Sequence, residues 1–410
     1  MEIAIIGAGA GGLAAALNAC HHAHVTLYER NSRAGRKLLA TGGGRCNLTN
    51  RETSLSHYHG HDINFTENIF RHFPPTKIEQ IFADLGVETV VEDHGRVFPR
   101  AGQAAAVLDN LRLYLLHHGV NEICDCEIVK IVPQKRGFTL YSAKNERFSA
   151  DKVIVAAGSL AAPNVGGSDK GYHLLESLGH TLIAPSEALV QLKCDSPVLK
   201  ALSGQKFEGE ATLIIDGASV RKETGEILFT DYGLSGLPIL QLSTHAVRAL
   251  NCGQKAAVSL DLAPEYFSDE FFRYLEKRQA LRGDIALEDF FTGFCPKRIG
   301  QQLIKAAINT PLSRSSSSLN KKELELLSFL AKNWLFPITD SMGFKNAQAA
   351  LGGIALKEFS FDTLESLLVP GLYACGEVLD ITGDCGGFNL QWAWASGLFC
   401  GMNAVCTLDE

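Results

Sequence analysis

The chain has 410 residues, of which 46% are apolar and 20% are charged. This composition is typical of a globular protein and excludes intrinsic disorder as the main state. At about 150 residues per domain, the length predicts two or three domains. The 38 basic and 45 acidic residues give a formal net charge of −7. Such a chain has no general electrostatic attraction for nucleic acid, so we expect no nucleic-acid partner.

Eleven cysteines are scattered along the chain, and none forms a C-x-x-C pair. This odd, unpaired set argues against a metal ribbon or a disulfide framework and favours a reducing compartment. The N-terminus lacks the basic segment of a signal peptide, and no stretch reaches the ~18 apolar residues of a membrane helix. We therefore expect a cytoplasmic protein with a small-molecule substrate, no membrane partner and no metal.

The first thirty residues predict one βαβ unit. IAII at 3–6 is an apolar run typical of a strand buried on both faces, and VTLY at 25–28 reads as a second strand. An alanine-rich helix lies between them, and Glu29 closes the second strand.

The turn after the first strand carries the spacing G-x-G-x-x-G at Gly7, Gly9 and Gly12. Gly7 allows the tight turn, Gly9 lets the backbone approach a pyrophosphate, and Gly12 lets the helix pack close to the strand. The helix N-terminus then faces the phosphates with unpaired N–H groups and its positive dipole end. Glu29 can accept hydrogen bonds from both ribose hydroxyls, which argues against a 2′-phosphate there. The unit therefore predicts dinucleotide binding.

The segment from 30 to 50 indicates FAD rather than NAD. A simple dehydrogenase would continue into another βα unit, whereas this loop can wrap a pyrophosphate and bring backbone amides against a flat ring. The loop carries a basic pair, three consecutive glycines and three further residues: Arg36 and Lys37, Gly42, Gly43 and Gly44, and Arg45, Cys46 and Asn47.

Two later segments are expected to return to the same site. VIVAAGS at 153–159 indicates another buried strand that ends in small residues. The segment 371–401 reads as a strand, an acidic loop, a double glycine and a helix that starts near Asn389. The N-terminal dipole of that helix, beside Gly386 and Gly387, suits the negative charge that reduction places on a flavin ring.

These motifs together resemble the BaiN/RdsA family of NAD(P)/FAD-dependent oxidoreductases, also known as the aminoacetone-oxidase-like FAD-binding family. The matching segments lie between residue 5 and about residue 401: GAGAGGLAAA, GRKLLATGGGRCNLTN, GLSG-x-P, FPI with GG-I-x-L-K-E, and PGLYACGEVLD with GGFNLQWAWASG. Two positions depart from the family pattern. Asp231-Tyr232 replaces a histidine before GLSG-x-P, and Ala350 replaces a threonine before a double glycine. We expect FAD binding to be unaffected by these departures. They do mean that the substrate of a characterised relative cannot be assigned to this chain.

The resemblance implies an α/β fold of the two-dinucleotide-binding-domains flavoprotein type, with bound FAD, an inserted β-barrel and a small helical domain. Short alternating strands from about 187 and helical spacing after Pro264 agree with this insertion. The expected domains are an FAD-binding domain at 1–186 and 345–410, a barrel at 187–262 and about 335–344, and a helical insert at 263–334.

The resemblance also implies which residues surround FAD. By position, the strand at Ile128 and Val129 lies against adenine, and Glu377 or Asp380 contacts the ribityl hydroxyls. The full set expected at the cofactor is Gly7, Gly9, Ala10, Gly11, Gly12, Glu29, Arg30, Arg36, Lys37, Gly42, Gly43, Gly44, Arg45, Cys46, Asn47, Ile128, Val129, Ala156, Ala157, Gly158, Gly376, Glu377, Asp380, Gly386, Gly387, Phe388, Asn389 and Gln391.

Two further features invite a chemical interpretation. His57, His59 and His61 alternate along the chain, but an extended loop offers no third direction for a metal ligand, so we expect a solvated loop. Flavin disulfide reductases carry two cysteines after the glycine turn. Here Cys46 stands alone, and the next cysteine is Cys124. We therefore expect no dithiol relay.

The expected function is that of an FAD-dependent oxidoreductase that passes hydride from flavin N5 to a small apolar acceptor such as a conjugated enone. The resemblance implies NAD(P)H as the reductant. Because the single dinucleotide fingerprint is assigned to FAD, NAD(P)H has to dock transiently over the flavin. Two alternatives stay open: an amine oxidase that passes electrons to oxygen, and a sensor or structural flavoprotein. No catalytic residue is assigned, because flavin N5 carries the chemistry.

Overall fold

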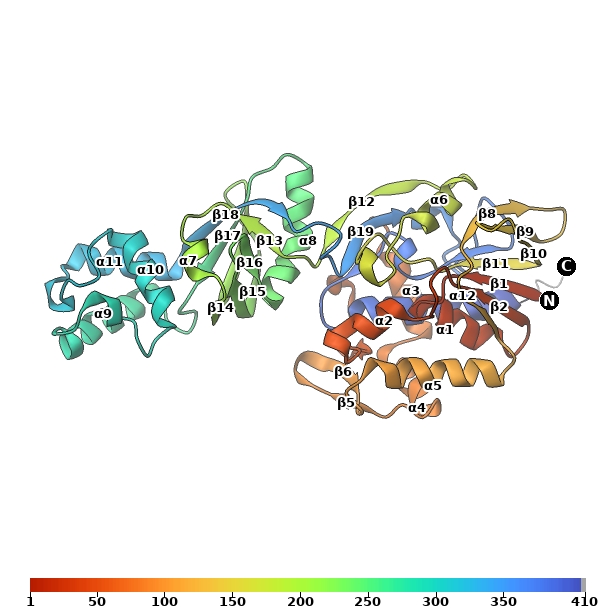
Figure 1. The fold of residues 1–410 in the computed structure, drawn as a ribbon, viewed down its shortest axis with the longest axis horizontal. Helices are drawn as coiled ribbons and strands as arrows, with labels where there is room; N and C mark the ends of the chain where they lie inside the picture. Colours follow the sequence, from red (N-terminus) through yellow and green to blue (C-terminus); the bar gives the residue numbers. More distant parts are fainter. Residues whose placement is uncertain (407–410) are drawn as a thin grey trace. The chain divides into compact units, whose positions relative to one another are not determined.

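The computed structural model describes residues 1–406, which fold as two compact units (Figure 1). Unit 1 comprises residues 1–186 and the chain from Gln348 onward, and unit 2 comprises residues 187–347. The chain leaves unit 1 once and returns to it once, so unit 2 is a single insertion in the sequence of unit 1.

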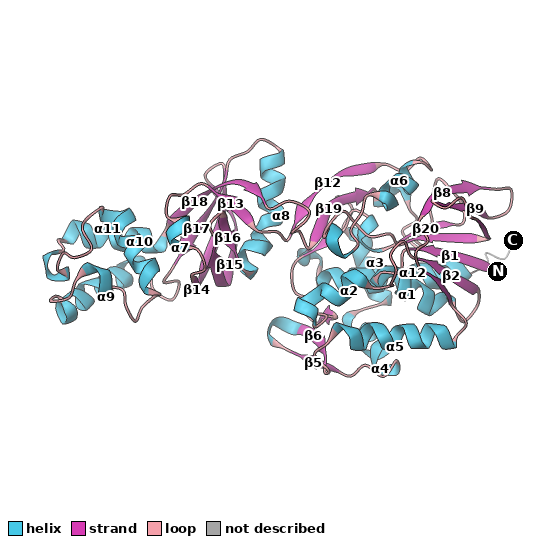
Figure 2. Ribbon diagram, viewed as in Figure 1, coloured by secondary structure: helices cyan, strands magenta, loops and turns pink. Residues whose placement is uncertain are grey.

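Unit 1 is built on a five-stranded parallel sheet (Figure 2). Residues 3–6 are buried throughout, which explains their unbroken apolar character in a parallel sheet. The strand order is β20 (Leu372–Ala374), β11 (Lys152–Val155), β1 (Glu2–Ile6), β2 (His24–Tyr28) and β7 (Asn121–Ile123). The central strand β1 therefore brings segments from both ends of the chain into one sheet.

Two helices of unit 1, α1 (Ala10–Ala19) and α12 (Phe388–Val405), pack with their backbones in close contact. A Cβ atom at Gly397 or Gly401 of α12 would lie 2.2 Å from the carbonyl oxygen of Gly11 or Ala15 of α1, respectively. No side chain fits into that space without displacing backbone. Glycine at these two positions is therefore what permits the helices to cross at this distance.

Smaller elements complete unit 1. The antiparallel strands are β8 (Ile128–Pro133), β9 (Phe138–Ser142) and β10 (Arg147–Ala150) in one sheet, β3 (Thr49–Asn50), β6 (Arg96–Pro99) and β5 (Thr89–Val91) in another, and β4 (Tyr58–His59) with β21 (Thr382–Gly383) in a ribbon. β12 (Leu182–Ala188) and β19 (Ala349–Ile354) form a further two-stranded sheet. The helices are α2 (Arg36–Ala40), α3 (Asn64–His72), α4 (Pro75–Asp84), α5 (Ala104–His117) and α6 (Lys170–Glu176).

Unit 2 contains a closed six-stranded barrel, and its helices lie between the barrel strands in sequence. The barrel order is β13 (Leu192–Cys194), β16 (Gly233–Ser235), β15 (Ala218–Phe229), β14 (Lys206–Ile215), β17 (Ala256–Asp261) and β18 (Trp334–Ser341). Its core includes the packed rings of Phe229, Trp334 and Phe336. The helices are α7 (Leu199–Leu202), α8 (Leu237–Asn251), α9 (Ser268–Arg282), α10 (Lys297–Ile308) and α11 (Lys321–Lys332).

The predicted α/β class with an inserted barrel and a helical region is confirmed. The barrel and the helices α9 to α11 belong to the same compact unit. Asp216 and Gly217, which join β14 to β15, both have positive φ angles, of 48° and 86°, as a tight hairpin turn requires. In the part of the chain from residue 1 to residue 406, no helix combines the length and the apolar character needed to cross a bilayer.

Alanine at Gly397 or Gly401 should destabilise unit 1, although a glycine-to-alanine change inside a helix ordinarily stabilises by about 0.5–1 kcal/mol. The added Cβ forces α1 and α12 apart, and overpacking of this kind costs about 1–3 kcal/mol. Thermal unfolding of the apoprotein measures the change. Gly9→Ala is the control, because a Cβ there meets no atom within 4 Å. A Gly397→Ala protein as stable as wild type would contradict the observed packing.

Candidate cofactor-binding site

The three glycines of the turn between β1 and α1 have different physical reasons to be glycine. Gly7 has a φ of +103°, and a Cβ there would lie 2.4 Å from the carbonyl oxygen of Ala156. A Cβ at Gly12 would lie 1.9 Å from the carbonyl oxygen of Gly7. Gly9 has an ordinary φ of −82°, and a Cβ there meets nothing within 4 Å. The fold therefore requires Gly7 and Gly12, whereas Gly9 borders open space.

The N-terminus of α1 faces that open space without a side-chain cap. Gly9 is the N-cap residue, and no acidic residue lies in the first turn. The first intrahelical bond runs from the N–H of Leu13 to the carbonyl oxygen of Gly9, so the N–H groups of residues 10 to 12 have no helical partner. These groups and the positive end of the helix dipole suit a phosphate.

Glu29 is buried at the end of β2 and is held in place by the backbone. One carboxylate oxygen accepts a hydrogen bond from the N–H of Ala8 at 3.0 Å, and the other accepts one from the N–H of Asn31 at 2.8 Å. Arg30 donates to the carbonyl oxygen of Gly166 at 2.9 Å, and Arg36 donates to the side chain of Asn31 at 3.1 Å. The loops that follow β2 and β11 are therefore joined beside this acid.

Segments distant in sequence meet where Lys37 contacts Glu377. The ammonium nitrogen lies 2.6 Å from a carboxylate oxygen of Glu377, and Ser159 donates to the same oxygen at 3.2 Å. Both partners are about one-fifth to one-quarter exposed, at 27% for Lys37 and 18% for Glu377. The structure thus brings together the predicted basic residue after β2 and the predicted acid after β20.

The small residues that follow β11 and β20 leave open space beside the backbone. Ala156, at the end of β11, bonds to β1 through its backbone N–H, and Ala157 follows it. Gly158 has a φ of +74°, and a Cβ there meets nothing within 4 Å. Gly376, after β20, also has a φ of +74°, and the nearest atom to its Cβ position is Gly11 Cα at 4.0 Å. These positions line the same side of the sheet as the glycine turn, at the carboxyl ends of the parallel strands, where α/β proteins bind their ligands.

In the glycine loop before β3, part of the backbone borders open space, whereas one side chain is bound to other protein groups. Gly42 and Gly43 have left-handed backbone angles, and a Cβ at Gly43 meets nothing within 4 Å. Arg45 lies over the ring of Phe98 at 4.2 Å and pairs with Glu92. The loop backbone thus remains available to a ligand, while the Arg45 guanidinium is engaged at the protein surface.

The double glycine before α12 is explained by contact with β3. A Cβ at Gly387 would lie 2.5 Å from the carbonyl oxygen of Thr49, and Asn50 donates to the carbonyl oxygen of Gly386 at 2.8 Å. The helix begins at Phe388, one residue before the predicted start. A side chain at Gly387 would therefore displace β3.

Two predicted cofactor residues of α12 use their side chains within the protein. Asn389 accepts from the N–H of Gly383 at 2.8 Å and donates to the carbonyl oxygen of the same residue at 2.7 Å. Gln391 accepts from the Thr49 hydroxyl and donates to the carbonyl oxygen of Phe73 at 2.9 Å. These contacts fix the start of α12 against its neighbours.

Among the residues of unit 1 up to 406, three buried polar atoms have no hydrogen-bond partner: Asn47 Oδ1, Tyr172 Oη and Asp380 Oδ1. Burial raises the pKa of Tyr172, with Glu377 adding to the effect, so its hydroxyl keeps its proton and can donate. An orphaned buried polar atom costs about 1–3 kcal/mol, and a polar ligand can remove that cost. Together with the open glycines, these atoms fit a large polar cofactor such as FAD. Tyr172 was missed from the sequence because one tyrosine in a helix carries no motif.

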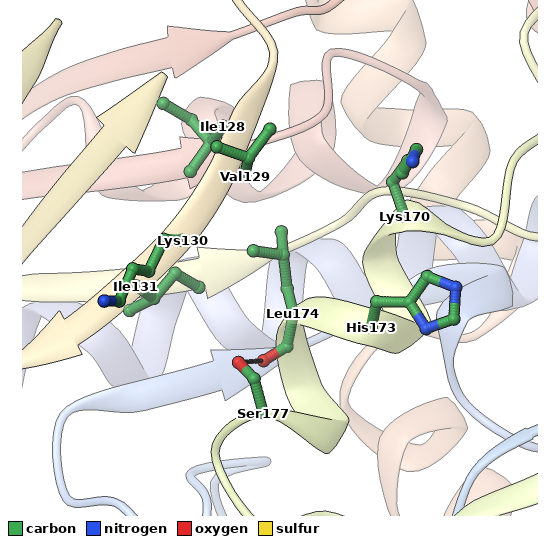
Figure 3. A pocket seen from close by; sticks show the side chains of 8 residues that line it. All are labelled: Ile128, Val129, Lys130, Ile131, Lys170, His173, Leu174 and Ser177. Atoms are coloured by element: carbon green, nitrogen blue, oxygen red, sulfur yellow. Dashed lines mark hydrogen bonds between the residues drawn. The ribbon is translucent and has the colours of Figure 1, made fainter. Parts of the chain in front are cut away.

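A cavity of about 390 Å³ lies between β8 and α6 (Figure 3). It includes the strand predicted to lie against adenine. The pairing of β8 with β9 shifts register between Ile128 and Lys130, so Val129 sits at a bulge, where the ladder leaves backbone groups unpaired. Its side chain is half exposed. The residues that line the cavity are Ile128, Val129, Lys130, Ile131, Lys170, His173, Leu174 and Ser177.

The expectation of a solvated histidine loop is wrong. His59 Nε2 lies 2.8 Å from a carboxylate oxygen of Asp384, and His61 Nδ1 lies 2.7 Å from one of Asp380. Both carboxylates are buried, at 2% and 1% exposure. The alternation H-x-H-x-H was the signal, because it matches D-x-T-x-D on the facing strand. Within residues 1–406, no three His, Cys, Asp or Glu side chains are grouped so as to hold a metal ion.

Asp380 is engaged by this pairing. Burial raises the pKa of its carboxyl, and the hydrogen bonds from His61 oppose that rise. Besides the imidazole contact, the N–H of His61 donates to the same oxygen at 2.9 Å. Only Oδ1 of Asp380 remains without a partner.

A parallel sheet that carries a glycine turn, an uncapped helix N-terminus and a buried acid at the end of the second strand defines a Rossmann-type dinucleotide-binding protein. The model of the family described as HI0933-like protein Rossmann domain matches residues 1–403. The chain belongs to this family, which comprises FAD-dependent oxidoreductases.

Several relatives match along nearly the whole chain. The chain is 36% identical to 3-dehydro-bile acid delta(4,6)-reductase of Clostridium scindens, over 98% of this chain and 99% of the relative. It is 29% identical to ribosomal RNA dihydrouridine synthase of Escherichia coli, over 98% of this chain and 97% of that protein. Among solved structures, 3-ketosteroid delta1-dehydrogenase from Sterolibacterium denitrificans shares the fold, with a TM-score of 0.51 at 12% identity, covering 98% of this chain and 99% of the other.

Gly9→Val should yield a folded protein that is purified without flavin colour. The valine side chain fills the open space at the N-terminus of α1 and excludes a pyrophosphate, while no protein atom lies within 4 Å of the Cβ position. Absorbance spectra and FAD titration measure occupancy, and circular dichroism verifies the fold. Wild-type FAD content in Gly9→Val would show that this turn does not hold the cofactor.

Cys46→Ser should retain flavin and most turnover. Cys46 is fully buried, and burial raises the pKa of its thiol to about 12, so no reactive thiolate forms at neutral pH. Cys375 contacts Cys400, but burial raises the pKa of the Cys400 thiol as well. Anaerobic dithionite titration should therefore take up two electrons per FAD. An uptake of four electrons would reveal a redox-active dithiol and contradict this expectation.

Proposed function

We propose that this protein is an FAD-dependent reductase that saturates a carbon–carbon double bond conjugated to a carbonyl group, with NAD(P)H as the reductant. The observation that carries the proposal is the open space at Gly9, beside an uncapped helix N-terminus, in a chain 36% identical to a reductase. The negative charge of an FAD pyrophosphate suits this position, and no protein atom lies within 4 Å of the Cβ position at Gly9.

The residues of unit 1 suggest how the cofactor is held. The first turn of α1, after Gly9, binds the pyrophosphate, and Glu29 accepts hydrogen bonds from the adenosine ribose. The unpaired backbone at Val129 faces adenine, and Glu377, with Lys37 beside it, binds the ribityl chain. When bound and reduced, FAD supplies a hydride from N5.

The names of the two relatives describe related chemistry. A 3-dehydro bile acid carries a carbonyl at C3, and its Δ4 double bond is conjugated with that carbonyl. Dihydrouridine forms when the 5,6 double bond of uracil, conjugated with the C4 carbonyl, is saturated. In both cases the double bond is conjugated with a carbonyl, which makes a carbon of the conjugated system able to accept a hydride. An enone-type acceptor therefore accounts for both relatives with one site chemistry.

A small molecule is the preferred substrate class for this chain. The identity is higher to the bile acid reductase, at 36%, than to the RNA-modifying relative, at 29%. The net charge of −7 also disfavours a polyanionic substrate. RNA is kept as the second candidate because the relatives named for ribosomal RNA match the full chain.

NAD(P)H is proposed as a transient reductant. The sequence has a single G-x-G-x-x-G turn, and FAD is assigned to it. A nicotinamide cofactor would therefore bind without a fingerprint of its own, dock over the flavin and leave after hydride transfer. Weak binding, with a dissociation constant well above that of FAD, is the expected consequence.

Anaerobic stopped-flow spectroscopy tests the proposal. NADH or NADPH should bleach the visible flavin absorbance of the FAD-loaded protein, and a 4-en-3-one steroid should restore it. A uridine-containing RNA is the second acceptor, and colourless Gly9→Val is the control. Recovery with RNA alone would replace the small-molecule assignment. Bleaching by amines instead of NAD(P)H would indicate an oxidase, and bleaching by neither would indicate a sensor or structural flavoprotein.

A further inference from the structure

The cavity between β8 and α6 has apolar side chains on both walls (Figure 3). Ile128 and Ile131 line it from the strand, and Leu174 extends into it from the helix. Lys170 and Ser177 lie four residues before and three residues after Leu174, so they share its face of α6. The volume of about 390 Å³ is within the range of small-molecule sites, about 300–1,000 Å³. The space between the two walls suits a flat ring with apolar faces.

The strand wall also offers backbone hydrogen-bonding groups. β8 lies at the edge of the sheet β10-β9-β8. Four consecutive residues, 128 to 131, line the cavity. Side chains alternate between the two faces of a strand, so a cavity that touches all four runs along the strand edge. An edge presents N–H and C=O groups without strand partners, and the bulge at Val129 adds to them.

The charged groups at the cavity favour an electron-rich ligand. Lys130 reaches it from β8 and Lys170 from α6, and neither ammonium group is paired with a carboxylate of residues 1–406. His173 is held on its own helix, 3.4 Å from Asp169 and 3.1 Å from Glu176. An unpaired ammonium group is attracted to the face of an aromatic ring and to ring nitrogens that accept hydrogen bonds.

Both walls of the cavity are tied to the segment that contains Glu29. The N–H of Cys126, two residues before β8, donates to the carbonyl oxygen of Glu29 at 2.9 Å. On the other side, the guanidinium of Arg30 donates to the carbonyl oxygen of Gly167 at 3.1 Å, three residues before α6 begins. The cavity therefore adjoins the buried acid to which the proposed function assigns the adenosine ribose.

We propose that α6 forms the second wall of an adenine-binding site, in which Leu174 packs on the base and Lys170 supplies a positive charge beside it, opposite the backbone of Val129. This inference rests on the proposed function, which places the adenosine half of FAD beside Glu29. Adenine has apolar faces, and its 6-amino group donates next to a ring nitrogen that accepts. That edge matches the N–H and C=O groups of an edge strand. The α6 wall thus contributes to the selection of FAD over FMN, which lacks the adenosine half.

The test compares three probes on the full-length protein freed of flavin: FAD, ADP and FMN. ADP carries the adenosine and the pyrophosphate without the flavin. Leu174→Trp puts a larger ring into the cavity and should weaken FAD and ADP by the same factor, at least about tenfold, while FMN binding stays unchanged. Lys170→Met keeps most of the side-chain length, removes the charge and should weaken both adenine nucleotides by about two- to fivefold. Isothermal titration calorimetry measures the dissociation constants.

Matched controls separate the cavity from the rest of the surface. Glu176→Trp places the same ring on α6 at an exposed position that does not line the cavity. Lys77→Met makes the same charge change at an exposed position of α4. Both should keep wild-type affinities. Ser177→Trp fills the cavity from an exposed position and replaces Leu174→Trp if that variant fails to fold, which thermal unfolding verifies.

A fourth probe tests recognition of the base. GDP has the same ribose and phosphates as ADP, but guanine carries an acceptor oxygen where adenine carries its amino group. The strand edge would then meet an unmatched group, and a lost hydrogen bond of this kind costs about 1–3 kcal/mol. GDP should therefore bind about tenfold more weakly than ADP.

Three results would overturn the adenine site: ADP affinity unchanged in both cavity variants, an equal loss in Glu176→Trp, or GDP bound as tightly as ADP. A wild-type protein that binds neither FAD nor ADP would overturn it too. The proposed reductase activity fails separately. If FAD and ADP respond to the cavity variants but no conjugated acceptor reoxidises the reduced flavin, the activity is wrong and the adenine site stands.

Discussion

The backbone contact between α1 and α12 is the constraint on which the rest of unit 1 depends. Gly397 and Gly401 allow the C-terminal helix to lie directly against the helix that follows the glycine turn. The same approach places Gly376 beside Gly11, with a Cβ at Gly11 only 3.7 Å from Gly376 Cα and 3.4 Å from Cys375 Sγ. One pair of helices therefore brings the N-terminal and C-terminal cofactor motifs to a single edge of the sheet. The 161 residues of unit 2, 187 to 347, are inserted between them in sequence without disturbing that contact.

Once the two ends of the chain meet, polar side chains from each end satisfy one another. Lys37 meets Glu377, Asn50 binds the backbone of Gly386, and His59 meets Asp384. A buried carboxylate without a partner is costly, and removing one member of a buried pair is strongly destabilising. The conformation of the C-terminal acidic loop therefore depends on the N-terminal loops as well as on its own sequence. This mutual dependence explains why one small ribbon can hold two buried aspartates.

The sequence predicted the elements whose determinants are local. The glycine spacing with Glu29 predicted the first βαβ unit, and the short alternating strands from about 187 agreed with the barrel, because each pattern depends on neighbouring residues. The histidine ribbon was not predicted, because the alternation of its histidines indicates a strand but not the facing acidic segment, which lies far away in sequence. Gly387 was expected at the cofactor, and the structure adds a reason for glycine that the sequence does not show, because the nearest neighbour of its Cβ position is Thr49 of β3. That contact joins residues far apart in sequence, which no local pattern encodes.

The glycines of this chain separate the demands of the fold from those of a ligand. Most have a left-handed φ or a protein atom within van der Waals distance of the Cβ position, and either condition explains glycine without reference to function. Among the glycines of residues 1–406, Gly9 alone has an ordinary φ and nothing within 4 Å. A methyl group would fit there without a steric clash, although glycine is a better N-cap residue than alanine. A group that approaches the backbone more closely than a methyl allows gives glycine a further reason at this position, outside the polypeptide. A pyrophosphate at the N-terminus of α1 meets that requirement.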